Sequence, residues 1–352
     1  MKSKINNFFE YFPFLINKKL NFFLSQVGDV ESLFFNQKNL QIEKPIFICG
    51  LARSGTTAIL NQLNNHIDTA SFENKDLPFI KTLFFWNKMN NFFYKGIKKK
   101  ERIHGDGFKV DQNTPEALEE LIWRDFLKGY ENNGFFSFLD ESYSDNKFEK
   151  YFIQQIKKIL KIRGNKKRYL SKCNYNIFRL KYIKKIFPDS KIIICFRDPI
   201  ETSLSSIKVH NIFLNLSKEN KYFDMRLKMM CHFEFGEYRK SIAGEYSDLN
   251  KHNLSNDQYY YLKQWHKIYS MVLNEYKNLK NLIFIDNSTL VHKPNILNNL
   301  LNNLDLDKNI NLNNAQFSKK NEYDLNLDKN KDLYELYDQL KFLEQKTLFN
   351  NE

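Results

Sequence analysis

The stretch of sequence that decides the fold is PIFICGLARSGTT, residues 45–57. Its first five residues form an apolar run that predicts a buried strand, and the segment after Thr57 predicts the start of a helix. The residues between have the spacing of a phosphate-binding loop, G-x-x-x-x-G-K-[ST], with Thr56 in place of the lysine. Such a loop directs backbone N–H groups and a helix N-terminus at an anion, so the stretch predicts an anion site.

The missing lysine bears on the kind of anion that binds. Hydrolysis of ATP or GTP needs that lysine on the β- and γ-phosphates, whereas this loop offers Arg53 at a different position. A P-loop nucleotide-dependent kinase is therefore an alternative and not the leading interpretation. A tight strand-to-helix turn without any ligand is a further alternative.

Composition narrows the classes of protein. The 352 residues carry a formal net charge of +13, and 42% of them are hydrophobic. The charge suits an anionic substrate, a membrane surface or nucleic acid. However, lysine and asparagine are abundant along the whole chain, so no single basic patch stands out. A basic protein that binds a membrane or nucleic acid remains an alternative, although we expect no nucleic-acid partner.

Cysteine usage and hydropathy bear on location. The four cysteines are isolated, without a C-x-x-C pair, which favours a reducing, cytoplasmic compartment. We find no clean signal peptide and no apolar run near the roughly 18 residues of a spanning helix. Residues 84–102 combine aromatic runs with a cluster of basic residues, which leaves peripheral membrane contact open.

The order of predicted elements indicates the fold class. Apolar runs predict strands at 45–49, 169–171, 192–196 and 282–285, with amphipathic helices between them. This order predicts an α/β fold, a P-loop-like and mostly parallel sheet flanked by helices on both faces. A capping hydroxyl followed by proline, Thr114-Pro115, also predicts a helix that starts there.

Two downstream pieces accompany the loop. One is Ser171-Lys172 at the end of a strand, and the other is Arg197-Asp198-Pro199 with Ser205 eight residues after the arginine. Together with the loop they resemble the sulfotransferase superfamily, which uses 3′-phosphoadenosine 5′-phosphosulfate (PAPS) as donor. The sequence is similar to the branch with an R-S-G-T-T loop, which includes tyrosylprotein and many bacterial sulfotransferases.

The resemblance covers roughly residues 44–305, and because the sequence contains no convincing linker we expect a single sulfotransferase domain over 1–352. We expect a helical N-terminal extension at 1–43, a core at 44–305, and a C-terminal arm and helix at 306–352. It also implies the acceptor class, a hydroxyl or an amine. A glycan, a lipid, a small molecule and a peptide all remain open as acceptors.

The resemblance assigns roles to the loop and to three residues outside it. The loop residues that would hold the 5′-phosphate and the sulfate are Arg53, Ser54, Gly55, Thr56 and Thr57. Arg197 and Ser205 would hold the 3′-phosphate, and Lys172 would face the leaving group. A sulfuryl group is less negative than a γ-phosphoryl group, so we expect no metal.

The general base is the least defined role. In the R-S-G-T-T branch a glutamate lies about twenty residues past the loop arginine, and Glu73 has that spacing from Arg53. The branch often has two adjacent acids, whereas Asn74 occupies the second position here. His104 is the rival base, with Asp106 placed to orient it.

Overall fold

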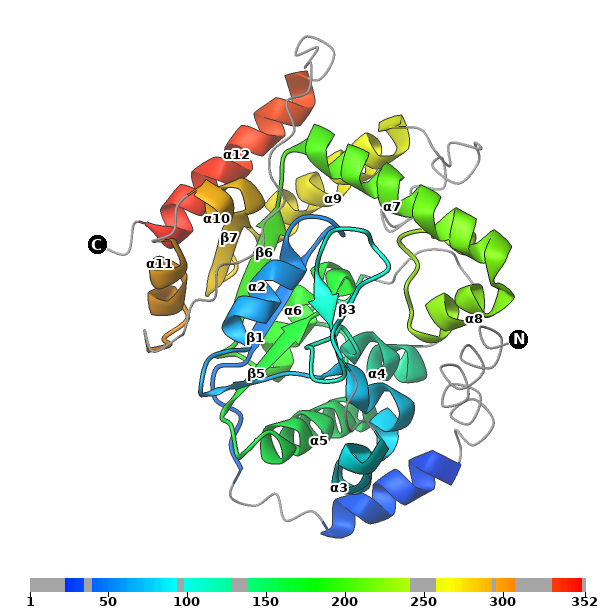
Figure 1. Ribbon diagram of the computed structural model, residues 1–352. Helices are drawn as coiled ribbons and strands as arrows, with labels where there is room; N and C mark the ends of the chain where they lie inside the picture. The colour runs from blue at the N-terminus through cyan, green and yellow to red at the C-terminus, as the bar shows by residue number, and fades with distance from the viewer. Residues whose placement is uncertain are drawn as a thin grey trace.

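Figure 1 shows the computed structural model of the chain. The structure describes residues 23–34, 40–93, 98–127, 138–240, 258–292, 296–307 and 331–349. Most of the N-terminal extension and of the C-terminal arm expected from the sequence therefore lies outside the described residues.

A five-stranded parallel sheet forms the centre of the molecule (Figure 1). Its strands, in spatial order, are β2 (Thr69–Ala70), β5 (Arg168–Lys172), β1 (Ile46–Gly50), β6 (Lys191–Phe196) and β7 (Leu282–Asp286). All four neighbouring pairs are parallel, so the carboxyl ends of the strands lie at one edge. This sheet confirms the predicted α/β fold class.

Helices pack on both faces of the sheet because the strands are apolar on both sides. Phe47 and Cys49 of β1 belong to one hydrophobic cluster, with residues of α5, α6 and α9. Ile46 and Ile48 belong to the other, with residues of α2 and α11. A helix covers residues 23–34, and two 3₁₀ segments are η1 (Asn74–Thr82) and η2 (Asn174–Phe178). The other helices of the described residues are α2 (Thr56–Leu63), α3 (Leu83–Phe93), α4 (Glu119–Phe126), α5 (Asn146–Ile162), α6 (Leu180–Ile186), α7 (Pro199–Glu219), α8 (Lys221–Met229), α9 (Gln258–Tyr276), α10 (Asn287–His292), α11 (Ile296–Asn303) and α12 (Lys331–Leu348).

The segment between α3 and α4 differs from the prediction. Strands β3 (Lys100–Glu101) and β4 (Lys109–Val110) form a small antiparallel hairpin that the sequence did not indicate. The helix expected at Thr114-Pro115 begins instead at Glu119. The Thr114 hydroxyl is used in a turn with Asp111, and Pro115 forms a bridge with Glu73. The hydroxyl expected to cap a helix therefore closes a turn, and the helix starts later.

Within the described residues, no helix is both long enough and apolar enough to cross a membrane.

Candidate functional site

The loop after β1 is held in shape by its own residues. Gly50 and Gly55 have φ angles of 143° and 95°. A Cβ at Gly55 would lie 2.4 Å from Asn287 Oδ1, and one at Gly50 would lie 2.3 Å from the Cys195 carbonyl oxygen. Both positions therefore require glycine. The buried Ser54 hydroxyl donates to the Leu51 carbonyl at 2.7 Å, which closes the loop on itself.

The end of this loop is the N-terminus of α2. Gly55 is its N-cap residue, and no side chain caps the first turn. The uncapped N–H groups and the helix dipole attract an anion. Thr56 is buried, with its hydroxyl 3.5 Å from Asn174 Oδ1, and Thr57 is half-buried. The loop thus has the geometry of an anion site.

Arg53 joins the loop to two other parts of the chain. It has a left-handed backbone, φ 74°, which is uncommon for a residue with a side chain. Its Nε donates to Ser205 Oγ at 2.9 Å, and its Nη1 lies 2.9 Å from Asp106 Oδ2. Burial lowers the pKa of Arg53 and Asp106 opposes this, while Arg102 and Arg197 lower it further. Arg53 and Ser205, expected at the two ends of the donor, are therefore in direct contact.

Asp106 lies in the turn of the β3–β4 hairpin and accepts from Arg53 and Arg102. Burial raises the pKa of this carboxyl, but the two guanidinium groups outweigh burial and hold the pKa well below its usual range. The sequence placed Asp106 beside His104 as its orienting group. The structure instead pairs Asp106 with the two arginines.

Arg197 follows β6 at the same edge of the sheet. Its Nε donates to Glu201 Oε2 at 2.9 Å, one turn along α7. Asp198 caps that helix by accepting from the Glu201 N–H, and Trp265 Nε1 donates to the Arg197 carbonyl at 3.0 Å. Arg197 therefore sits on a fixed backbone near Arg53, with Glu201 as its partner.

Lys172 is the last residue of β5 and pairs in register with Ile48 of β1. The residues beside it are tethered to α4: Ser171 donates to Glu119 and Cys173 to Glu120. Burial raises the pKa of Glu119, and its four side-chain donors offset part of that rise. Among the described residues, the Lys172 ammonium forms no hydrogen bond or ion pair. The end of β5 is therefore fixed, and the Lys172 ammonium is available to bind an anion.

The two predicted bases have different surroundings. Glu73 follows β2 and forms ion pairs with Arg163 at 2.9 Å and Lys75 at 2.6 Å. Burial raises its pKa, and the two cations offset only part of that rise. No hydrogen bond or ion pair between described residues joins Glu73 to the loop. Its carboxylate is therefore already engaged.

His104 is half-buried and packs against Phe213, with ring centroids 5.4 Å apart. Its Nδ1 has no hydrogen-bond partner among the described residues. Burial, followed by Arg102 and Arg53, lowers its pKa well below the usual value. The lowered pKa favours the neutral imidazole, and no hydrogen bond between described residues joins His104 to Asp106.

One pair at this edge was not singled out from the sequence. Glu234 Oε2 lies 3.7 Å from His232 Nδ1, and Glu234 Oε1 accepts from Asn174 Nδ2 at 3.0 Å. Burial raises the pKa of Glu234, but His232, Lys172 and Asn174 outweigh it and lower the pKa to about 2. The signal in the sequence is the alternation His232-Phe233-Glu234-Phe235, in which both phenylalanines are buried.

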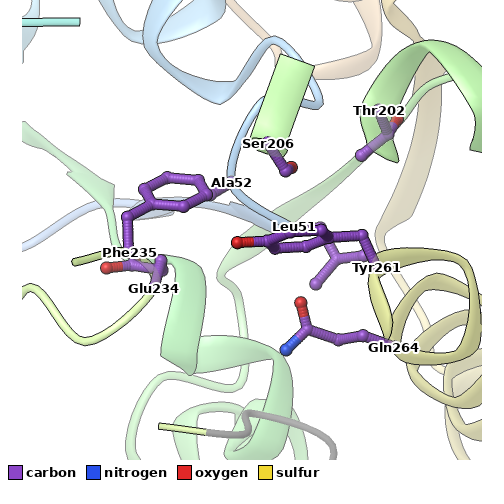
Figure 2. Close-up of a pocket in the computed structure, with 8 residues that line it drawn as sticks. All are labelled: Leu51, Ala52, Thr202, Ser206, Glu234, Phe235, Tyr261 and Gln264. Carbon is purple, nitrogen blue, oxygen red and sulfur yellow. The ribbon is translucent and has the colours of Figure 1, made fainter. Parts of the chain in front are cut away.

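A small cavity of about 10 Å³ lies behind the loop (Figure 2). Figure 2 shows Leu51 and Ala52 of the loop between residues of three other segments. The full lining is Leu51, Ala52, Thr202, Ser206, Glu234, Phe235, Tyr261 and Gln264. This volume holds about one water molecule, so the cavity itself does not hold a nucleotide.

No group of three or more histidine, cysteine, aspartate or glutamate side chains in the described part of the chain is placed to hold a metal ion.

Comparisons with known proteins bear on this site. Residues 45–270 match a protein-family model described as the sulfotransferase family. A sulfotransferase structure from Mycobacterium tuberculosis H37Rv matches with 14% identity and a TM-score of 0.44, covering 83% of this chain and 74% of that one. One from Mycobacterium avium matches with 12% identity and a TM-score of 0.42, covering 92% and 79%. One from Alicyclobacillus acidocaldarius matches with 11% identity and a TM-score of 0.39, covering 88% and 98%. No curated protein matches the chain.

Proposed function

This chain belongs to the sulfotransferase family, and from that premise we propose its donor and its site. The donor is PAPS, and the acceptor carries a hydroxyl or an amine. The site is the carboxyl edge of β5, β1 and β6. The observation that carries the proposal is the convergence of Arg53, Ser205 and Arg197 beside the uncapped N-terminus of α2.

Each part of the donor has a matching group in this proposal. The loop residues 53–57 hold the 5′-phosphate and the sulfate with backbone N–H groups, the threonine hydroxyls and the Arg53 guanidinium. Arg197 and Ser205 hold the 3′-phosphate. The Arg53–Ser205 hydrogen bond of 2.9 Å supports this division, because it brings the two anion sites side by side.

Lys172 supplies a positive charge beside the leaving oxygen of the donor. Transfer breaks the bond between sulfur and the bridging oxygen of the 5′-phosphate, so negative charge grows on that oxygen. A cation at the fixed end of β5 stabilises this charge more in the transition state than in the ground state. Arg53, Lys172 and backbone donors neutralise the charge, so we expect transfer to continue in EDTA.

We keep Glu73 and His104 as proposed acid–base groups of the site. The contacts of each residue determine how it could accept a proton. Glu73 has to leave part of its contact with Arg163 and Lys75 to reach a proton. His104 Nδ1 has no hydrogen-bond partner in the part of the chain that the structure describes, but the lowered pKa of His104 weakens it as a base.

The remaining expectations also stay proposals. The chain forms one domain with helical ends, as the sequence predicted, and works in the cytoplasm, with peripheral membrane contact open. The similarity to the tyrosylprotein branch remains a prediction, and the acceptor is a glycan, a lipid, a small molecule or a peptide.

Nucleotide binding tests this function. The product 3′-phosphoadenosine 5′-phosphate (PAP) should stabilise the protein by about 2.7 kcal/mol at about 100 times its Kd. Adenosine 5′-phosphate should bind more weakly, since it lacks the 3′-phosphate. Thermal melting with each nucleotide measures both effects. Equal affinity for the two overturns the donor assignment, and stabilisation by ATP with Mg²⁺ in place of PAP favours the kinase alternative.

A further inference from the structure

We propose that His232 takes the proton from the acceptor and that Glu234 positions it. The inference rests on the proposed function and names a catalytic residue for it. It follows from the backbone that presents His232, from the contacts that join Glu234 to the donor site, and from the surroundings of the other candidate bases.

The backbone before His232 is fixed by the end of α8. The Cys231 N–H donates to the Lys228 carbonyl, and the His232 N–H donates to the Leu227 carbonyl at 2.9 Å. These two bonds form the motif that closes a helix with a left-handed residue, and here that residue is Cys231, with φ 55°. Glycine is the usual residue at such a position. The strained backbone therefore determines where His232 stands.

Hydrogen bonds to distant side chains also fix the backbone after His232. The Phe233 N–H donates to the Tyr175 hydroxyl at 3.0 Å, and the Gly236 N–H donates to His210 Nδ1 at 3.0 Å. Phe233 and Phe235 are buried. The chain bends over residues 234–236, and the 3.7 Å contact between His232 Nδ1 and Glu234 Oε2 places these two side chains on the same side.

Contacts join this pair to the donor site. Glu234 accepts from Asn174, which stands two residues after Lys172 and whose amide oxygen lies 3.5 Å from the Thr56 hydroxyl. Lys172 itself lies close enough to lower the pKa of Glu234. Glu234 thus links His232 to the part of the site where the leaving nucleotide would lie, beside Lys172.

The geometry suits proton transfer from an acceptor hydroxyl. His232 Nδ1 faces the Glu234 carboxylate at 3.7 Å, which favours the tautomer with its proton on Nδ1 and a free lone pair on Nε2. The side chain is 28% exposed, so an acceptor can reach it. The acceptor proton goes to Nε2 as the acceptor oxygen bonds to sulfur and the bridging S–O bond breaks. PAP leaves with its charge beside Lys172.

The surroundings of the other candidates favour His232. Glu73 is engaged by two cations, and the positive charges of Arg102 and Arg53 lie near His104 and disfavour its protonation. The charged group within 4 Å of the His232 imidazole is the anion Glu234, and Lys172, His104 and the Tyr175 hydroxyl are further titratable groups near the pair. An anion beside the imidazole stabilises the imidazolium that the reaction forms.

The first experiment compares H232Q with H104Q. Release of labelled sulfate from PAPS to 4-nitrophenol or to water is measured in single turnovers, and PAP binding is measured by calorimetry. H232Q should lower kcat by at least about a hundredfold while the Kd for PAP changes less than about threefold. Loss of turnover in H104Q with unchanged turnover in H232Q would assign the base to His104 and overturn this inference. A wild-type protein that does not bind PAP overturns the proposed function. PAP binding with unchanged turnover in H232Q overturns only this inference.

Two further measurements separate a base from a structural residue. Added imidazole should restore part of the turnover of H232A, and it should not restore E234Q. Substitution E234Q should move the acid limb of the kcat/KM profile to lower pH, because the imidazolium loses its anion. An H232A protein that folds and binds PAP but gains nothing from imidazole contradicts the role of His232.

Discussion

The proposed donor loop (residues 50–57) and the segment that carries the proposed base (residues 231–236) differ in how their sequences encode them. The loop has a local signature, two glycines at fixed spacing and the Ser54–Leu51 hydrogen bond, although distant residues also contact it. The other segment begins at the end of α8 and is held beyond that point by distant residues, Tyr175 and His210. One is a continuous motif, and the other is an assembly of separate parts of the chain.

The difference follows from what each region binds. A donor anion is bound largely by backbone N–H groups, which need a fixed chain path and therefore glycine at fixed spacing. Proton transfer needs a side chain at one point in space, and any part of the chain can supply it. The loop is therefore recognisable in the sequence, whereas the His232–Glu234 pair is recognisable only once the chain is folded.

The largest expected effect concerns Lys172. This residue ends β5 beside the strand that leads into the loop, and its charge also acts on Glu234. K172M should lower kcat by about 10²- to 10³-fold, because the leaving oxygen loses its cation. The Kd for PAP should change much less. K181M is the matched control, since Lys181 forms an exposed pair with Glu275 at 3.0 Å, away from the loop. Single-turnover transfer from labelled PAPS measures the effect, and a tenfold or smaller loss contradicts the assignment.

The next effect concerns Arg197 and the 3′-phosphate. R197A should remove most of the preference for PAP over adenosine 5′-phosphate, a loss of about 1.5–3 kcal/mol. E201Q frees the guanidinium from its 2.9 Å partner and should change affinity in the opposite direction. Calorimetric titration with both nucleotides measures the difference. An R197A protein that keeps the full preference would falsify a role for Arg197 in 3′-phosphate binding.

A pair of glycines tests the contrast in how the two regions are built. Gly55 and Gly107 both have positive φ, at 95° and 77°, but a Cβ at Gly107 meets nothing within 4 Å. Each alanine substitution should cost about 1–2 kcal/mol of stability from backbone strain. Only G55A should also weaken PAP binding, because its Cβ displaces Asn287. Chemical denaturation and PAP titration measure the two effects, and equal loss of binding in both variants contradicts the contrast.

The smallest effect concerns Asp106, which holds Arg53 from the hairpin. D106N keeps the shape but removes the anion that competes with the donor, so PAP should bind more tightly by about 0.5–1 kcal/mol at low salt. The gain should shrink as salt rises. Titration at two salt concentrations measures it. Weaker binding in D106N shows instead that Asp106 positions Arg53 for the donor.

The sequence by itself determined the fold class, the family and the local structure of the proposed donor loop. The apolar run 45–49, the glycines at 50 and 55 and the strand that ends at Lys172 specify local structure through short-range sterics and burial, so the parallel sheet and the loop were predicted from them. The family followed from the same residues and is confirmed by the match over 45–270.

Tertiary structure decided what depends on contacts between distant residues. Asp106 binds Arg53 and not His104, and Glu73 is engaged by Arg163. Charge and hydrogen-bonding capacity are present in the sequence, but their partners lie tens of residues away. Only the folded chain determines which cation reaches which carboxylate, because those energies depend on distance and burial.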